Sequence, residues 1–187
     1  MKIVFNTNKY LQIETDRLLL EKLGYGDENF IFNLYSNEEV MRYMQSPMMN
    51  DIKEAEKFVE KMNNMYEKEN GIRWKMMTKK DVSTPIGTFA IHYYNKSSKR
   101  AELGADLLPE YWNKGYISEI TSFFIDNLFN ILDLNRVEIR CMPENIASIN
   151  IAKKFNFTYE GRLRDYVFVE DKGFTDEMVF SLLKREI

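Results

Sequence analysis

Apolar residues recur at helical spacing in the first third of the chain. A strand-like run at 17–23 leads to a turn at Gly24 and Gly26, and amphipathic helices are predicted at about 27–35 and 51–68. The apolar face of the second helix is marked by Ala55, Phe58, Val59 and Met62. Four methionines lie between these helices, and we expect them in the core or lining a binding surface: Met41, Met44, Met48 and Met49.

The pattern changes after Gly71 to alternation and short apolar runs. These predict strands at 72–78, 86–94 and 101–108. The segments between them, 81–85 and 95–99, are rich in turn residues. We therefore expect three consecutive strands paired as an antiparallel meander.

A helix is predicted from Gly115 to about residue 131, followed by a strand at 136–142. Because strand, helix and strand form a crossover, the strands before and after this helix are expected to be parallel. The apolar face of the helix consists of Ile117, Ile120, Phe124, Leu128 and Ile131.

The last part of the chain reads as one more helix and a hairpin. Asn145 is a candidate N-cap for a helix at 145–155, and Asn156 a left-handed residue after it. Strands follow at 157–169 and 174–183. The prediction is a single mixed α/β (α+β) domain over 1–187, with an N-terminal extension at 1–16. Its mixed, mostly antiparallel sheet has about seven strands and is flanked by about four helices.

Composition narrows the possible classes of protein. The 187 residues are 44% hydrophobic and 29% charged, as in a globular domain. Lys and Arg number 26 against 29 for Asp and Glu, so the net charge of -3 gives no overall basic excess for nucleic acid. Apolar runs are short and there is one cysteine, Cys141, so we expect a cytoplasmic protein without a membrane span or disulfide.

The segment 101–119 carries the clearest chemical signal. A strand enters a tight loop with a glycine, and the loop opens onto an amphipathic helix. Free N–H groups and the positive dipole end at such a helix start suit a phosphate or diphosphate. A glycine before a helix can also mark only a turn, so this segment alone leaves both interpretations open.

Several short sequence motifs, taken together and in their order along the chain, narrow the interpretation of this segment. They are Ala-Glu-Leu-Gly at 101–104, Pro-Glu-Tyr-Trp-Asn-Lys-Gly-Tyr-Ile-Ser-Glu at 109–119, Glu-Asn-Ile-Ala-Ser at 144–148 and the run 155–164. With them the chain resembles the GNAT superfamily of N-acetyltransferases, RimJ/RimL type, over about 17–184. The resemblance implies the GNAT fold and transfer of an acetyl group from acetyl-CoA to a primary amine, without a metal.

The resemblance also assigns residues to the coenzyme. On a strand that splays from its parallel neighbour, Leu107 with its neighbours Asp106 and Leu108 would hydrogen-bond the pantetheine arm. Asn145 and Ser148 would lie along the coenzyme near its sulfur. The loop that would take the diphosphate comprises Asn113, Lys114, Gly115, Tyr116, Ile117 and Ser118.

Several positions depart from the family pattern, among them Asn113, which stands where Gly is common. Trp112 stands where Gln or Arg is usual, and Ile117 where Gly or Ala is usual. Ala105 and Asp106 replace an aromatic pair, a change that bears on the acceptor pocket.

Candidate catalytic groups follow from direct attack of a neutral amine on the thioester. Glu102 is the candidate base, through water, and Ser148 the candidate proton donor to the departing thiolate. Plainer alternatives are a Glu102 paired with Arg100 and an Asn145 that only caps its helix. His92, the one histidine, is expected at a surface or pocket wall rather than in catalysis.

The acceptor amine is left open by the sequence. Residues 28–66 and 166–175 are expected to shape its site. The first hypothesis is the α-amine of a protein N-terminus, as the RimJ/RimL resemblance suggests. The others are a small amine such as a polyamine or antibiotic, and a non-catalytic acetyl-CoA-binding module. We expect no nucleic-acid or membrane partner, and a homodimer is one possible assembly.

Overall fold

The computed structural model describes residues 11–187, except the side chains of Leu128 and Asn130. Its core is one sheet of eight strands in the order β1-β2-β3-β4-β5-β6-β8-β7. The predicted mixed α/β GNAT-type fold is confirmed. The strands are β1 Gln12–Glu14, β2 Leu18–Lys22, β3 Ile72–Thr78, β4 Asp81–Asn95, β5 Arg100–Leu107, β6 Arg136–Cys141, β7 Thr158–Val169 and β8 Gly173–Leu183.

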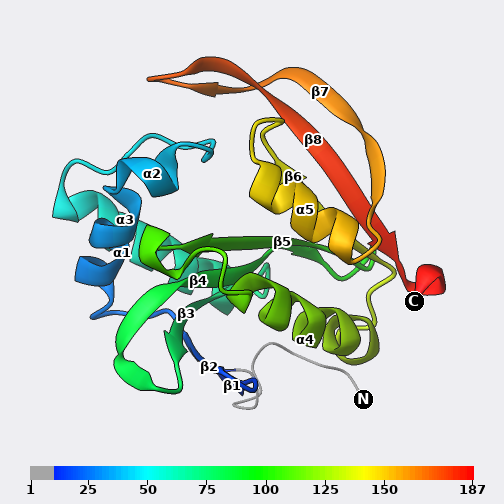
Figure 1. Cartoon of the computed structure of the whole chain (residues 1–187), viewed down its shortest axis with the longest axis horizontal. Helices are drawn as coiled ribbons and strands as arrows, with labels where there is room; N and C mark the ends of the chain where they lie inside the picture. The colour runs from blue at the N-terminus through cyan, green and yellow to red at the C-terminus, as the bar shows by residue number, and fades with distance from the viewer. Residues whose placement is uncertain (1–10) are drawn as a thin grey trace.

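Helices lie on both faces of this sheet. They are α1 Glu28–Tyr35, α2 Glu38–Met41, α3 Ile52–Glu67, α4 Tyr116–Ile131 and α5 Ile146–Lys154, with short 3-10 turns at Pro109–Tyr111 and Lys184–Glu186. Figure 1 shows α4 and α5 together on one face, with α1, α2 and α3 gathered on the left, apart from them. Among the described residues no helix is both long and apolar enough to cross a membrane.

Strand pairing confirms the two topological predictions. β3, β4 and β5 form the antiparallel meander. β5 and β6, which flank α4 in the sequence, are the parallel pair. That pairing covers only Arg100↔Arg136 to Leu103↔Ile139, although β5 runs on to Leu107 and β6 to Cys141. The two strands therefore diverge after Leu103, and each keeps only its other neighbour.

The structure adds elements too short for a periodic pattern. β1 has three residues and pairs with β2, so part of the predicted N-terminal extension belongs to the sheet, while residues 1–10 lie outside the described part. α2 is a single turn capped by the side chain of Asn37. The segment predicted as a turn at 81–85 begins β4 instead, since Asp81 pairs with Thr78 across two register shifts.

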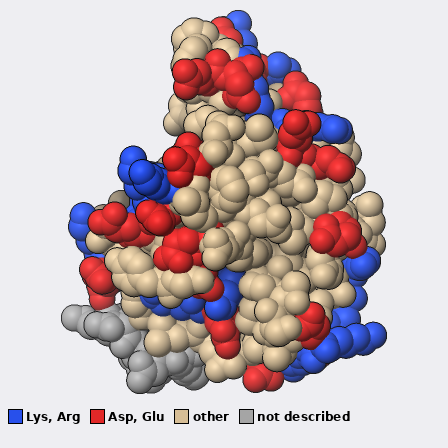
Figure 2. Space-filling view, turned by 90° about the vertical axis from the view of Figure 1, so that its left-hand side faces the viewer, with Lys and Arg blue, Asp and Glu red and all other residues tan. Residues whose placement is uncertain are grey.

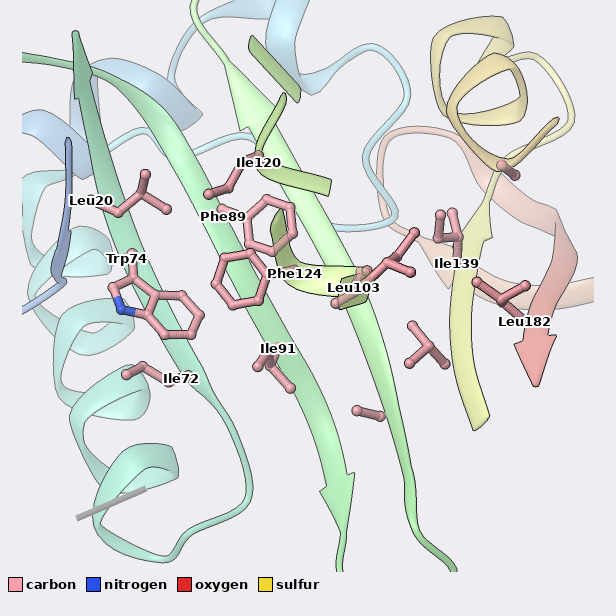
Figure 3. Packing of buried hydrophobic residues seen from close by; sticks show 14 of the residues in the cluster. Leu20, Ile72, Trp74, Phe89, Ile91, Leu103, Ile120, Phe124, Ile139 and Leu182 are labelled. Atoms are coloured by element: carbon pink, nitrogen blue, oxygen red, sulfur yellow. The ribbon is translucent and has the colours of Figure 1, made fainter. Parts of the chain in front are cut away.

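Two apolar clusters hold the helices to the sheet. Between the sheet and α4, the ring of Phe124 lies 4.6 Å from that of Phe89 and 5.1 Å from that of Trp74 (Figure 3). The other cluster joins α1, α2 and α3 and contains Met41, with Met44, Met48 and Met49 packed on it, as predicted. Leu128, predicted on the apolar face of α4, is among the side chains outside the description.

Candidate functional site

The divergence of β5 from β6 leaves main-chain groups without a strand partner. Successive residues of a strand point their N–H and C=O groups to alternate edges. The N–H of Leu108 donates to the carbonyl of Ile86 at 3.0 Å, so Leu108 and Asp106 face β4, while Ala105 and Leu107 face the gap toward β6. A linear ligand with amide groups could pair with this edge as a strand would.

This register refines the predicted contacts of β5. The N–H groups of Asp106 and Leu108 are turned toward β4, whereas that of Leu107 faces the gap. Contact of these three residues with a pantetheine arm stays a prediction. Ala105, which sequence analysis did not propose, faces the gap, and alternation along the strand was the signal that could have found it. The carbonyl of Leu107 accepts a 2.8 Å bond from Nε1 of Trp112. The main-chain N–H of Leu107 takes no part in this bond and faces the gap.

The loop after β5 presents a run of free donors. No described residue accepts a hydrogen bond from the main-chain N–H groups of residues 113–118. The first backbone bond at the start of α4 is from Glu119 N to Gly115 O, at 3.0 Å. An isolated helix leaves about four such groups free, and this loop adds those of Asn113 and Lys114.

Left-handed backbone at two positions shapes this loop. Asn113 has φ 58° and Gly115 has φ 79°. Alternating right- and left-handed residues turn successive N–H groups into one concavity, which binds anions. The side chain of Trp112 ties the loop to the end of β5, in the position where the family pattern has Gln or Arg.

The start of α5 carries the second predicted cluster. Oδ1 of Asn145 accepts a bond from Ser148 N at 3.1 Å, so the predicted capping role of Asn145 is confirmed. Ser148 is half-buried, and within the described chain its hydroxyl has no hydrogen-bond partner. α4 and α5 pack on the same core cluster, through Ile120 and Ile149 among others.

These features fit a coenzyme that combines an anionic diphosphate with an amide-containing arm. The donors at 113–118 suit the diphosphate. The free edge at Ala105 and Leu107 suits the amides of the arm. The Ser148 hydroxyl is available as a proton donor.

Glu102 lies on the opposite face of β5 from the core residues Ala101 and Leu103. Its side chain is 20% exposed, and its nearest cation is Arg140 on β6, with Nε 3.5 Å from the carboxylate, rather than the predicted Arg100. Burial raises the pKa of Glu102 to about 7, against the opposing effect of Arg140 and with smaller upward contributions from Glu177 and Glu138. A carboxyl with this pKa can accept a proton near neutral pH.

A buried polar network lies farther along the same face. Nη1 of Arg73 donates to Oδ2 of Asp106 at 3.0 Å, to the hydroxyl of Tyr35 at 2.7 Å and to Oγ1 of Thr88 at 2.5 Å. The hydroxyls of Tyr35 and Thr88 also donate to the same carboxylate oxygen. The side chain of Asp106 is therefore committed to the protein interior, and this network was not foreseen from the sequence.

His92 extends this network toward Glu102. Its Nε2 lies 3.0 Å from Nη2 of Arg73, and a Cβ at Gly104 would come within 2.9 Å of it. Burial and the positive charge of Arg73 lower the pKa of His92 to about 3. A neutral His92 of this kind is a weak base, which agrees with the prediction that it is a wall residue. No cluster of side chains able to hold a metal occurs among the described residues.

The two segments predicted to shape the acceptor site touch each other. Nζ of Lys172, in the β7–β8 turn, donates to the carbonyls of Met41 and Met44 at 2.7 and 2.8 Å. Nε2 of Gln45 donates to Oγ1 of Thr175 at 3.3 Å. The hairpin thus reaches across to α2 and the segment after it (Figure 1).

Comparison with known proteins also finds N-acetyltransferases. The family model for the acetyltransferase (GNAT) domain matches residues 17–158. YoaA of Bacillus subtilis, an uncharacterized N-acetyltransferase, is 33% identical over 92% of this chain and 96% of its own. The spermidine N(1)-acetyltransferase of Vibrio cholerae is 24% identical over 83% of this chain and 87% of its own.

A solved structure supports the fold at low identity. It is that of a Salmonella typhimurium acetyltransferase that modifies the N-terminal serine of a 50S ribosomal subunit protein. It superposes with a TM-score of 0.79 and 15% identity, over 90% of this chain and 96% of its own. Family model and full-length relative agree with the motifs, so the chain belongs to the GNAT family of acetyl-CoA-dependent N-acetyltransferases.

Proposed function

We propose that this chain transfers the acetyl group of acetyl-CoA to the α-amine of a peptide or protein N-terminus. The coenzyme part of the proposal rests on the run of main-chain donors at 113–118 without acceptors in the described chain, and the acceptor part rests on the exposed aromatic residues of the β7–β8 hairpin. The run of donors lies beside the free edge of β5, and together the two would hold the coenzyme from its diphosphate to its thioester.

The free edge also has a role in the chemistry. Acetyl-CoA supplies a thioester carbonyl, whose oxygen gains negative charge when an amine attacks. The N–H groups of Ala105 and Leu107 face the gap where that carbonyl would lie, and such fixed donors stabilise the charge. The hydroxyl of Ser148 would give its proton to the departing thiolate, which leaves as the thiol of CoA, and would regain a proton from water.

Glu102 would take the proton of the attacking amine. It lies three residues before Ala105, which is about 10 Å along a strand, so it acts through water rather than by direct contact. Its pKa of about 7 lies close to that of an α-amine, about 7.7 to 8.0. A lysine-type amine, near 10.4, would have a much smaller neutral fraction at the same pH.

The surface near the acceptor segments suits a peptide. The β7–β8 hairpin exposes Tyr166, Phe168 and Phe174, and the rings of Phe168 and Phe174 lie 5.2 Å apart. Figure 2, which looks at the side where α1, α2 and α3 lie, shows a broad uncharged surface with charged groups around it. Exposed aromatic groups of this kind contact peptide chains well.

A small polyamine is the second candidate. It is favoured by the carboxylates around Arg140, since Glu138 and Glu177 both lie within 3.0 Å of its guanidinium and Glu102 lies 3.5 Å away. Glu138 also pairs with Arg136, which pairs in turn with Glu160. Four carboxylates against two arginines leave a local negative charge that would attract a cationic amine. The relation to spermidine acetyltransferases points the same way.

An acceptor screen with labelled acetyl-CoA separates these candidates. We expect label in peptides with a free N-terminus and none in the same peptides with a blocked N-terminus and an internal lysine. Preferential labelling of spermidine would favour the second candidate. Binding of acetyl-CoA without multiple turnovers on any amine would leave only a binding module.

A further inference from the structure

Arg17 reaches the loop at 113–118 from the other end of the sequence. It lies just before β2, and its Nη1 donates to the carbonyl of Lys114 at 3.0 Å. Its guanidinium also lies 4.8 Å from the ring centre of Tyr116, and Nη2 would be 3.5 Å from a Cβ at Gly115. One side chain therefore bonds to Lys114, lies over the ring of Tyr116 and borders Gly115 between them.

Glu119 holds this arginine in place. Nε of Arg17 donates to Oε2 of Glu119 at 2.6 Å, and the main-chain N–H of Arg17 donates to Oε1 at 2.8 Å. Oγ1 of Thr15 donates to the same Oε1 at 2.5 Å. The carboxylate on the first turn of α4 thus fixes the chain between β1 and β2 against the loop, although the side chain of Arg17 is 50% exposed.

The bond to Lys114 determines which way a peptide plane faces. In a trans peptide the C=O and the following N–H point in opposite directions. Since the carbonyl of Lys114 points outward to Arg17, the N–H of Gly115 points away from Arg17. A flip of this peptide would turn a carbonyl oxygen, which repels anions, toward the other donors of the loop.

We propose that Arg17 is a positioning residue that fixes the Lys114–Gly115 peptide with its N–H facing the bound diphosphate. This inference rests on the proposed function, which assigns the diphosphate to residues 113–118. The role of Arg17 is exerted through the loop, so the donors are arranged before the coenzyme arrives and little ordering remains to be done on binding.

Calorimetry of CoA binding to the full chain tests this role. Arg17→Gln should weaken CoA about tenfold, as expected for loss of a charge-assisted hydrogen bond. In Arg17→Lys the single ammonium group can donate to Lys114 or to Glu119, but it cannot reach both as the guanidinium does. The affinity of this variant for CoA should lie between those of the parent and Arg17→Gln. Arg162→Gln is the matched control, because Arg162 is 53% exposed and pairs with Asp176 away from the loop. It should bind CoA as the parent does.

Two further measurements separate positioning from a general loss of stability. In the ligand-free protein, hydrogen exchange at 113–118 should be faster in Arg17→Gln than in the parent, with exchange in β3 and β4 unchanged. Affinity for pantetheine, which lacks the diphosphate, should not change in an NMR titration. Equal weakening of CoA and pantetheine, or unchanged CoA affinity, would overturn the inference.

Gly115→Asp distinguishes this inference from the assignment of the loop itself. It places a negative charge in the loop at a residue with φ 79°. If it abolishes CoA binding while Arg17→Gln does not weaken it, only the role of Arg17 fails. If CoA binds normally to Gly115→Asp, the proposed diphosphate site fails as well.

Discussion

Replacing Glu102 with Gln should stabilise the folded protein in a pH-dependent way. Burial raises the pKa of Glu102 from 4.5 to about 7, so the folded chain binds this proton more tightly than the unfolded chain. The free energy of unfolding then falls as pH rises from about 4.5 to about 7, because the folded state holds a carboxylate that the unfolded state accommodates better.

The size of the effect follows from the two pKa values. Their difference, 7 minus 4.5, corresponds to about 3 kcal/mol at roughly 1.4 kcal/mol per unit, which is an upper figure for a side chain that is still 20% exposed. Glu102→Gln removes the buried charge. The variant should therefore match the parent near pH 4 and exceed its free energy of unfolding at pH 8 by up to about 3 kcal/mol.

Urea denaturation at the two pH values measures this difference. Glu160→Gln is the control, because hydrogen bonds from Ser181 and Arg136 lower the pKa of Glu160, so its replacement should not stabilise the protein at pH 8. A stability difference between Glu102→Gln and the parent that is the same at pH 4 and pH 8 would refute the reasoning.

The same variant tests the role of Glu102 in transfer. With the base removed, the rate should fall more for amines of pKa near 10 than for α-amines, which are already partly neutral at pH 7. Pre-steady-state transfer to spermidine and to a peptide N-terminus would be compared across pH 6 to 9. An unchanged pH–rate profile would exclude Glu102 from the mechanism.

Substitutions at three further residues test contacts that stabilise the structure around the candidate site. Asp106→Ala leaves the buried guanidinium of Arg73 without its carboxylate and should cost about 3 to 5 kcal/mol in urea denaturation, whereas Asp106→Asn, which keeps an oxygen acceptor, should cost less. Asn145→Ala removes the cap of α5 and should cost about 1 kcal/mol, and Asn145→Ser should recover most of it. Trp112→Phe removes the bond to the carbonyl of Leu107 and should lower the free energy of unfolding by about 1 kcal/mol. Hydrogen exchange in the loop at 113–118 should become faster in this variant. A cost near zero for any of them would mean that the contact named does not stabilise the fold.

Much of the fold was readable because periodic segments are long. The helical spacing in α3 and α4 and the crossover from β5 to β6 predicted the parallel pair and the helix that follows the loop. β1 and α2 were missed because three or four residues are too few to show a period. The start of β4 was missed because turn residues there are paired across register shifts.

The arrangement of the candidate site was predictable only where its residues are neighbours in sequence. Asn145 as a cap and the loop from Asn113 to Ser118 follow from neighbouring residues. The bond of Tyr35 to Asp106 joins residues 71 apart, and that of Arg17 to Lys114 joins residues 97 apart. Such contacts depend on tertiary packing, which cannot be inferred from the spacing of residues along the chain.

A crystal structure of the chain with CoA would test the central claim most directly. We predict that diphosphate oxygens lie within hydrogen-bond distance of the N–H groups of residues 113–118. The pantetheine arm should follow the free edge of β5 at Ala105 and Leu107. CoA bound elsewhere, with this loop contacting only solvent, would contradict the account.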